Sequence, residues 1–463
     1  MTFGHIVSFA LGAFAVLGVT TSTVYSLMVV AGVFRFRRRA ASAPESLFLP
    51  PLSVLKAVHG DEQDLEQNLA SFFEQDYPEF EILFCARHSS DAGLAAARRV
   101  AARYPQVKAR ILACGEPPWP NARTFSLEIM RREARYPILV AADSDVRVGP
   151  DYLASIVQPM RDEQVGMVTC VYRGVTRHGL WAQLEAMGMS IEMTSGVLVA
   201  AMLEGMQFAL GPTMVMRTRS VEKIGGFAQV AQYYADDFVL GNRIAQAGEK
   251  VVLSPYIIEH HVLNASFARS IAHQQGWATS TRFSRPMGHF GSLLTFAVPF
   301  GLLALAVLGA NRHLALGLAL FAFTVLDRVL LAVLVSALVV KDGPALRKAW
   351  LYPLRDFMGS ASGSGVTSAN ASAIVANPTN CFPRDGCGSW RKPRKKLKFP
   401  QNLRICGRPP EDGAQPSASV SAQSPRRTPP HSAGIAPASP SAHTPQSSAS
   451  AGSSPPSAPA SAG

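Results

Sequence analysis

The first long apolar stretch of the chain covers residues 6–34 and contains no charged side chain. A helix of about 20 apolar residues spans a bilayer, so we expect a membrane anchor over residues 5–39. Arginines follow the apolar stretch at once, at 35 and 37–39, whereas a signal peptide carries its charge before a shorter apolar core. This arrangement predicts a retained anchor whose C-terminal end faces the cytoplasm.

Between residues 47 and 262, short apolar runs alternate with segments of helical periodicity. In chain order these are a strand at 52–58, a helix at 65–75, a strand at 80–85, a helix at 94–104 and a strand at 138–142. This alternation predicts an α/β domain with a parallel sheet and helices on both faces. Ligands of such sheets bind beyond the carboxyl ends of the strands, where Asp143 and Asp145 follow the strand at 138–142.

Two further apolar runs cover residues 290–310 and 314–340, joined by three residues. We expect a transmembrane hairpin over 290–340, preceded by an interfacial segment at 263–289 and followed by a juxtamembrane segment at 341–358. Asp327 and Arg328 interrupt the second run, and charge within a membrane is costly unless it is paired or faces protein. Basic residues at 341, 347 and 348 place the end of the hairpin in the cytoplasm.

The character of the chain changes at residue 359. Residues 359–463 are rich in Ser, Ala, Pro and Gly, with a basic patch at 391–398. Such a composition cannot bury enough apolar surface to fold, so we predict a disordered tail and assign it no function.

Composition supports a membrane protein and excludes other classes. The chain is 48% hydrophobic and 16% charged, below the roughly 25% of ordinary soluble domains. Its net charge of +12 lies beside apolar runs or in the tail, and there is no aromatic-basic stripe, so we predict no nucleic-acid partner. Six cysteines without a CxxC pair exclude a disulfide framework and a zinc site.

Two acidic motifs carry the candidate chemistry. Asp143 and Asp145, separated by one residue, could bind one hard cation, although a turn or a helix cap is the commoner reason for such a triplet. Asp236 and Asp237 precede a predicted helix. They could cap it, or one of them could act as a general base with its pKa raised by the other.

Taken in order along the chain, the motifs resemble the ceramide glucosyltransferase family, and within it the bacterial glycosyltransferases associated with hopanoid biosynthesis. The matching stretches are 53–62 (SVLKAVHGDE), 71–78 (SFFEQDYP), 81–87 (EILFCAR), 143–148 (DSDVRV), 224–227 (IGGF) and 234–238 (YADDF). The resemblance covers residues 5 to 358. It implies a GT-A fold, an inverting hexosyltransferase that uses a UDP-sugar (GlcNAc or glucose), and a lipid acceptor, either a hopanoid or ceramide. It also implies a bacterial inner membrane with the catalytic domain in the cytoplasm.

The resemblance further implies roles for individual residues. Asp91 would lie at the uridine end of the donor, and Asn121 and Arg123 would contact the donor, with arginine in place of the usual lysine. Asp143 would bind donor and metal, and Asp145 would bind the same Mg²⁺ or Mn²⁺. Asp237 would be the catalytic base, with Asp236 beside it.

One motif departs from the family pattern. His273 and Trp277 match the acceptor and diphosphate region, but Gly276 stands where the family has arginine. Arg282 or Arg285, one or two turns on, would be the substitutes. A catalytically impaired membrane pseudoenzyme is therefore the alternative of a different class, and the four matching aspartates argue against it.

Overall fold

The computed structural model describes residues 3–40, 46–177, 179–262 and 266–368. The chain divides into two compact units, residues 1–408 and 409–463, and every described residue belongs to the first. The predicted tail beyond residue 368, with its basic patch and Cys381, Cys387 and Cys406, lies outside the described residues.

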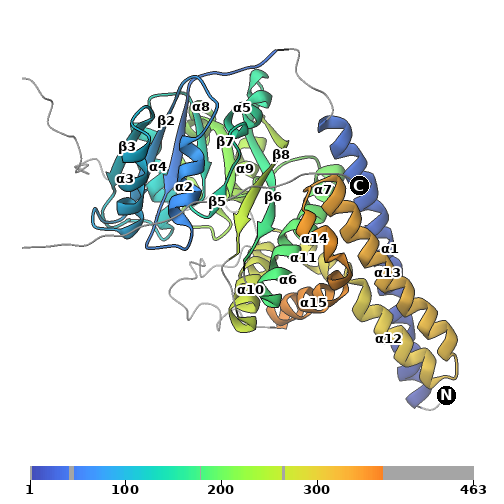
Figure 1. Cartoon of the computed structure of the whole chain (residues 1–463). Coiled ribbons are helices and arrows are strands. Elements are labelled where there is room, and N and C mark those ends of the chain that lie inside the picture. Colours follow the sequence, from blue (N-terminus) through green and yellow to red (C-terminus); the bar gives the residue numbers. More distant parts are fainter. Residues whose placement is uncertain (1–2, 41–45, 178, 263–265, 369–463) are drawn as a thin grey trace, which may run out of the picture. The chain divides into compact units, whose positions relative to one another are not determined.

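The described strands form one mixed sheet in the order β3-β2-β1-β4-β7-β6-β8-β5 (Figure 1). The strands are β1 (Leu52–Ala57), β2 (Phe80–Ala86), β3 (Lys108–Ala113), β4 (Ile138–Ala142), β5 (Val146–Arg147), β6 (Val165–Val175), β7 (Thr213–Arg217) and β8 (Lys250–His261). The first four are parallel, but β7 is antiparallel to both β4 and β6. The expectation of a parallel sheet is therefore wrong for this part of the domain, because β7, which lies next to β4 in the sheet, runs in the opposite direction.

Helices cover both faces of this sheet, as predicted. They are α2 (Leu65–Phe73), α3 (Ala92–Arg103), α4 (Ala122–Glu133), α5 (Tyr152–Ile156), η1 (Gln158–Arg161), α8 (Thr218–Lys223), η3 (Phe227–Gln229) and α9 (Asp236–Gln246). On one face, side chains of α2, α3 and α5 pack against Leu52 and Val54 of β1. On the other face, α4, α8 and α9 pack against Leu55, because successive strand residues point to opposite sides. The predicted α/β, GT-A-like domain is confirmed.

The apolar segments outside this domain are helical. They form α1 (Phe3–Ala40), α11 (Pro286–Leu293), α12 (Ala297–Ala310) and α13 (Leu314–Leu338), and α1 lies alongside α12 and α13 (Figure 1). Among the described helices, α1 and α13 are long and apolar enough to cross a membrane, and α11 with α12 form a pair bent by 45° that passes the same test together. The predicted first arm of the hairpin is thus a broken helix.

A third helix of sufficient length and hydropathy was not expected at all. Residues Leu180–Leu203 form α6 (Leu180–Met187), the π-helix η2 (Gly188–Met193) and α7 (Thr194–Leu203). In its apolar 18-residue stretch, 61% is buried inside the protein, whereas the corresponding stretches of α1 and α13 are 17% and 28% buried. It packs on β6, α1, α13 and the C-terminal elements, so its apolar residues serve protein contacts.

The charges within α13 are paired, as predicted. Arg328 is 2% exposed and lies 3.2 Å from Asp327 and 3.5 Å from Asp356. The Ser26 hydroxyl of α1 donates to Asp327 at 2.9 Å. These contacts join α1 and α13 to the C-terminal helix that carries Asp356.

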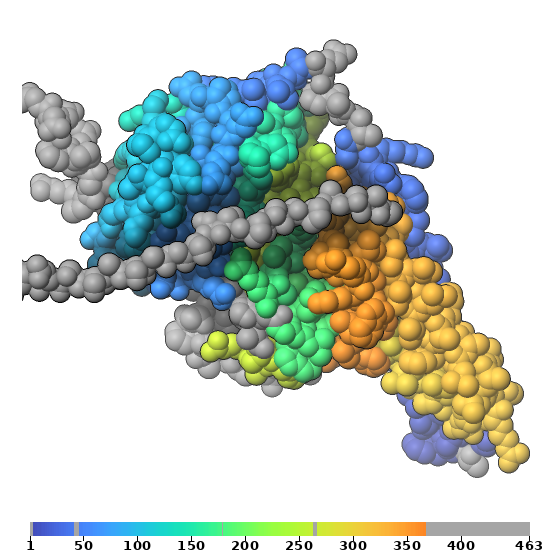
Figure 2. Space-filling model, viewed as in Figure 1, coloured from blue at the N-terminus to red at the C-terminus, as the bar shows by residue number. Residues whose placement is uncertain are grey.

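The C-terminal elements are α14 (Gly343–Arg347), η4 (Ala349–Leu351) and α15 (Tyr352–Ser368). The predicted boundary at residue 359 is wrong, since α15 continues through Ser368. Gly359 and Gly363 allow this close packing, because a side chain there would meet Phe296 and Leu293 respectively. Figure 2 shows the surface of α15, in orange, next to that of α6, in green.

Candidate active site

The predicted donor-site residues meet at one edge of the sheet. Asp143 and Asp145 follow the carboxyl end of β4, and His260 lies near the end of β8. Arg123 is in the first turn of α4, and Asp236 and Asp237 begin α9. This is the sheet edge at which the fold class binds its ligands.

Arg123 links the two acidic motifs. Its Nε donates to Asp143 at 2.8 Å, one terminal nitrogen donates to Asp236 at 2.8 Å, and the other donates to the carbonyl oxygen of Gly211 at 2.9 Å. A guanidinium can make these three planar contacts at once, whereas the lysine ammonium of the family pattern is a single point of charge. The substitution therefore gives this site a fixed cation between Asp143 and Asp236.

Asp237 has the environment of a general base. Its carboxylate accepts from the backbone N–H of Gly211 at 2.5 Å and of Phe238 at 2.8 Å. Burial, and then the negative charge of Asp236, raise the pKa of Asp237 to about 6. A base poised near neutral pH is suited to proton transfer.

Asp145 is paired with a histidine that the sequence analysis missed. Burial raises the pKa of Asp145, but the charge and hydrogen bond of His260, 3.1 Å away, together with the charge of Lys56 outweigh this effect, so the net pKa is lowered. Burial lowers the pKa of His260, but the charge and hydrogen bond of Asp145, together with the charges of Asp143 and Glu185, more than reverse this, so the net shift is upward. In the sequence, this residue was marked only by being one of two consecutive histidines at the end of an apolar run.

The acidic residues fit a metal ion that is shared with a ligand. Within the described ranges, no three His, Cys, Asp or Glu side chains come together as a metal site. Asp145 nevertheless keeps one buried carboxylate oxygen, Oδ1, without a hydrogen-bond partner among these residues. Mg²⁺ is commonly held by one or two carboxylates together with substrate phosphates, so two aspartates suffice.

Lys56 is a second residue that the sequence analysis missed. Its ammonium group lies in the acidic site, although the residue belongs to β1, and the side chain is fully buried. Its Nζ donates to the carbonyl oxygen of Asp143 at 2.5 Å and lies 3.8 Å from the centre of the Phe72 ring. Burial lowers the pKa of Lys56 to about 7, against the attraction of Asp143 and Asp145. Its position within the matching stretch 53–62 was the available signal.

Asp91 and Asn121 cap helices in this region. Asp91 accepts from the N–H of Gly93 at 2.8 Å and of Gly60 at 2.9 Å, and its second oxygen lies 3.1 Å from His59. Asn121 accepts from the N–H of Thr124 at 3.1 Å. Both side chains are thus helix caps in the structure, and their contacts with a donor remain a prediction.

The remaining predicted residues lie on α10 (Phe267–Ser284). The His273 ring packs on Trp277, with ring centres 4.4 Å apart. A Cβ atom at Gly276 would lie 3.2 Å from the hydroxyl oxygen of Tyr234, which precedes Asp236 by two residues. This part of α10 therefore lies beside the turn that carries the proposed base.

The two arginines expected to replace the missing one are engaged elsewhere. Arg282 donates to the carbonyl oxygen of Val366 in α15, and Arg285 pairs with Glu204. Arg123 is the guanidinium that contacts the predicted donor-site carboxylates.

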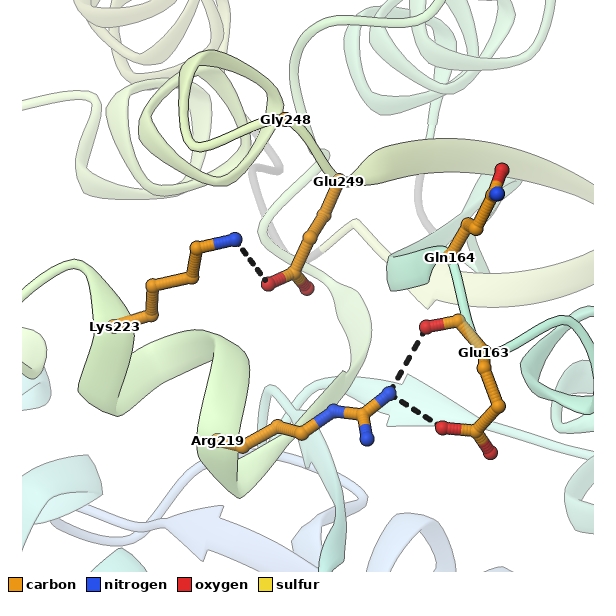
Figure 3. Close-up of a pocket in the computed structure, with 6 residues that line it drawn as sticks. All are labelled: Glu163, Gln164, Arg219, Lys223, Gly248 and Glu249. Atoms are coloured by element: carbon orange, nitrogen blue, oxygen red, sulfur yellow. Dashed lines mark hydrogen bonds and ion pairs between the residues drawn. The ribbon is translucent and has the colours of Figure 1, made fainter.

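A surface pocket of about 550 Å³ lies away from these residues. It is lined by Glu163, Gln164, Arg219, Lys223, Gly248 and Glu249 (Figure 3). These residues flank the amino ends of β6 and β8. Its charges pair with each other, Arg219 with Glu163 and Lys223 with Glu249, so it is distinct from the site built above.

The chain is a glycosyltransferase. The model of Glycosyl transferase family 21 matches residues 13–362, more than half of the 463 residues, and the chain belongs to this family.

Individual curated relatives share low sequence identity with this chain. The chain is 27% identical over 236 residues to ceramide glucosyltransferase 1 of Caenorhabditis elegans, covering 51% of this chain and 50% of that one. It is 30% identical over 142 residues to ceramide glucosyltransferase of Komagataella phaffii, covering 29% and 28%. The chain thus spans about half the length, or less, of these curated relatives.

Solved structures of other proteins are also similar. A mannosyltransferase from Pyrobaculum calidifontis, in complex with GDP-Man and Mn²⁺, is 19% identical with a TM-score of 0.44, covering 76% of this chain and 98% of that one. TarS of S. aureus, in complex with UDP-GlcNAc, is 13% identical with a TM-score of 0.34, covering 68% and 92%.

Proposed function

We propose that this protein is an inverting, metal-dependent glycosyltransferase that moves a sugar from a UDP-sugar onto a membrane lipid. Membership of glycosyl transferase family 21 supports the reaction class. The observation that carries the proposal is the cluster at one sheet edge, where Arg123 holds Asp143 and Asp236 and the raised pKa of Asp237 suits a base. The apolar helices α1, α12 and α13 support a lipid acceptor.

In this reaction Asp237 takes the proton from the lipid hydroxyl, and the hydroxyl oxygen forms a bond to the anomeric carbon. The bond from that carbon to the diphosphate breaks on the opposite face, so the configuration inverts and UDP leaves. Asp143 and Asp145 would hold Mg²⁺ or Mn²⁺, and the ion would neutralise charge on the leaving diphosphate. Arg123 and Lys56 hold Asp143, and His260 pairs with Asp145.

For the acceptor we propose a hopanoid, with UDP-GlcNAc as donor, because the motifs resemble those of the bacterial branch. Glucose transfer to ceramide is the second candidate. It is favoured by the names of the relatives, which are ceramide glucosyltransferases. We propose that the site faces the cytoplasm of a bacterial inner membrane, on the strength of the arginines that end α1.

The test is transfer by the purified full chain in nanodiscs, with UDP-GlcNAc or UDP-glucose offered against a hopanoid or ceramide. Mass spectrometry of the extracted lipid identifies the product, and Asp237→Asn is the inactive control. Glycosylated hopanoid is the expected result. Glycosylated ceramide alone would replace the acceptor, and a folded chain that neither transfers nor hydrolyses donor in the presence of Mn²⁺ would favour the pseudoenzyme.

A further inference from the structure

A tyrosine that the sequence analysis did not single out lies within the candidate active site. Tyr172 belongs to the long strand β6 and pairs with Ile258 of β8. The register of these two strands shifts between Cys170 and Tyr172, and such irregularities are common next to active sites, where they re-aim a side chain. In the sequence Tyr172 stands in an apolar run, so only the tertiary structure reveals its position.

The ring of Tyr172 has two sets of neighbours. Its centre is 5.4 Å from the centre of the His260 ring, and His260 in turn pairs with Asp145. The tyrosine ring also packs against a buried apolar cluster, which consists of Ala182, Ala186, Met189 and Val262. A ring fixed by such contacts holds its hydroxyl at one place in the site.

The hydroxyl of Tyr172 lies near three carboxylates. Burial, and then their negative charges, raise the pKa of this hydroxyl. In order of effect, the charges belong to Asp237, Asp145 and Asp143. Because the interaction between charges weakens with distance, all three carboxylates lie near the tyrosine oxygen. The oxygen keeps its proton at neutral pH and can therefore donate a hydrogen bond.

This hydroxyl has no hydrogen-bond partner among the residues that the structure describes. Tyr172 is partly exposed, and its oxygen is not one of the fully buried polar atoms. A phenylalanine would make the same ring contacts without the cost of desolvating a polar group, so packing does not explain the hydroxyl. Buried tyrosine hydroxyls usually find a partner, and a ligand in the site can be that partner.

The location of the hydroxyl indicates which part of a donor it would meet. In the proposed reaction, Asp143 and Asp145 hold the diphosphate through a metal ion, and Asp237 lies beside the acceptor hydroxyl. The transferred sugar connects these two groups, because its anomeric carbon is bonded to the diphosphate before the reaction and to the acceptor oxygen afterwards. A hydrogen-bond donor near both acidic motifs therefore lies next to the sugar.

We propose that Tyr172 is a donor-binding residue, whose hydroxyl donates a hydrogen bond to a hydroxyl group of the transferred hexose of the UDP-sugar. This inference rests on the proposed function and deepens it, because it names a residue that contacts the sugar itself. The ionised carboxylates around the sugar only accept hydrogen bonds, so Tyr172 supplies a donor that they cannot. A site built to bind a substrate hydroxyl discriminates strongly against the analogue that lacks it.

The test compares Tyr172→Phe with the wild type, as full chains in nanodiscs with Mn²⁺. Calorimetry measures the affinities for UDP, UDP-GlcNAc and UDP-glucose. Tyr172→Phe should bind the UDP-sugar that the wild type prefers about 3- to 10-fold more weakly, the usual effect of one neutral hydrogen bond, and should bind UDP with unchanged affinity. Its melting temperature should not fall, because the hydroxyl that is removed has no partner among the described residues. Tyr256→Phe is the matched control, since the Tyr256 hydroxyl accepts from the N–H of Gly149 at 3.0 Å and its loss should leave both affinities unchanged.

A second comparison identifies the sugar hydroxyl. The probes are analogues of the preferred UDP-sugar that each lack one hydroxyl group of the hexose. The wild type should bind one of them more weakly than the parent compound, and Tyr172→Phe should lose this discrimination, because removing either partner breaks the same hydrogen bond. A Tyr172→Phe variant that discriminates between all the analogues as the wild type does would contradict the proposal.

Equal affinity of Tyr172→Phe and the wild type for the UDP-sugar would overturn the inference. An equally large loss of affinity for UDP would also overturn it, because the contact would then be to the nucleotide or the diphosphate. Slower transfer without weaker UDP-sugar binding would assign the contact to the acceptor, with the same consequence. If the wild-type chain binds a UDP-sugar but transfers nothing to lipid, the proposed function fails, and the measured affinities still decide the role of Tyr172.

Discussion

Replacing Asp237 by asparagine tests the proposed base while keeping the size of its side chain. The carboxylate accepts one backbone N–H on each oxygen, from Gly211 and Phe238. An amide has one acceptor oxygen, so one of these donors loses its partner, at about 1–3 kcal/mol. A domain with about 5–15 kcal/mol of stability still folds after such a loss. Turnover should fall about 10²–10⁴-fold, the usual contribution of a general base.

The pH dependence gives a second measure of the same group. A base works in its deprotonated form, and the pKa of Asp237 is about 6. The pKa is raised, so the proton is retained up to a higher pH than usual, and activity is lost as pH falls through about 6. Below that pH, kcat should drop about tenfold per pH unit, with a plateau above it. Asp236→Asn should move this limb to lower pH, since the charge of Asp236 helps to raise the pKa.

The assay is release of UDP with a lipid acceptor, together with donor affinity from calorimetry, for the wild type, Asp237→Asn and the exposed control Asp151→Asn. Donor affinity should survive in all three. If Asp237→Asn keeps near wild-type turnover, or if the acidic limb remains in that variant, Asp237 is not the base.

Three further predictions concern the metal, the glycine and the tail. Asp145→Ala should abolish the binding of Mn²⁺ in the presence of UDP, measured by electron paramagnetic resonance, and full activity in excess chelator would contradict the metal role. Gly276→Arg should raise turnover by placing a cation near the diphosphate, provided that the Tyr234 hydroxyl moves aside, and an unchanged rate would show that Arg123 already supplies that charge. Truncation after Ser368 should leave activity within about twofold, since the truncated chain keeps the whole of α15. Loss of activity in a truncated chain that folds and inserts normally would give the tail a role.

Much of the fold was predictable because periodicity and burial agree in the N-terminal half. The strand predicted at 138–142 is observed as Ile138–Ala142, and the helix predicted at 65–75 as Leu65–Phe73. The direction of β7 could not be predicted, because an apolar strand reads the same in either direction. The end of α15 was missed because its Ser and Gly residues have the composition of a loop, while their packing against α11 and Phe296 stabilises a helix.

The site residues that form sequence motifs could be predicted, whereas those brought into the site only by the tertiary fold could not. Arg123, Asp143 and Asp236 were each proposed from the resemblance, and in the structure each of the two carboxylates lies 2.8 Å from the Arg123 guanidinium. Lys56 and His260 come from strands whose apolar pattern concealed them. Their roles follow from the strand order, which places the ends of β1 and β8 beside Asp143 and Asp145.

The buried helix at Leu180–Leu203 affects how the topology of this protein should be mapped. Hydropathy alone would count it as a crossing and would place everything after it on the opposite side of the bilayer. Asp237 would then be separated from Asp143 by a lipid layer, although Arg123 binds both Asp143 and the neighbouring Asp236. Reporter fusions inserted beyond Leu203 would interrupt the packing of this helix, so their signal would not report which side of the membrane the native domain faces. Reporters are better placed at residues 311–313 between α12 and α13, where an inverted result cannot be produced by unfolding the sheet.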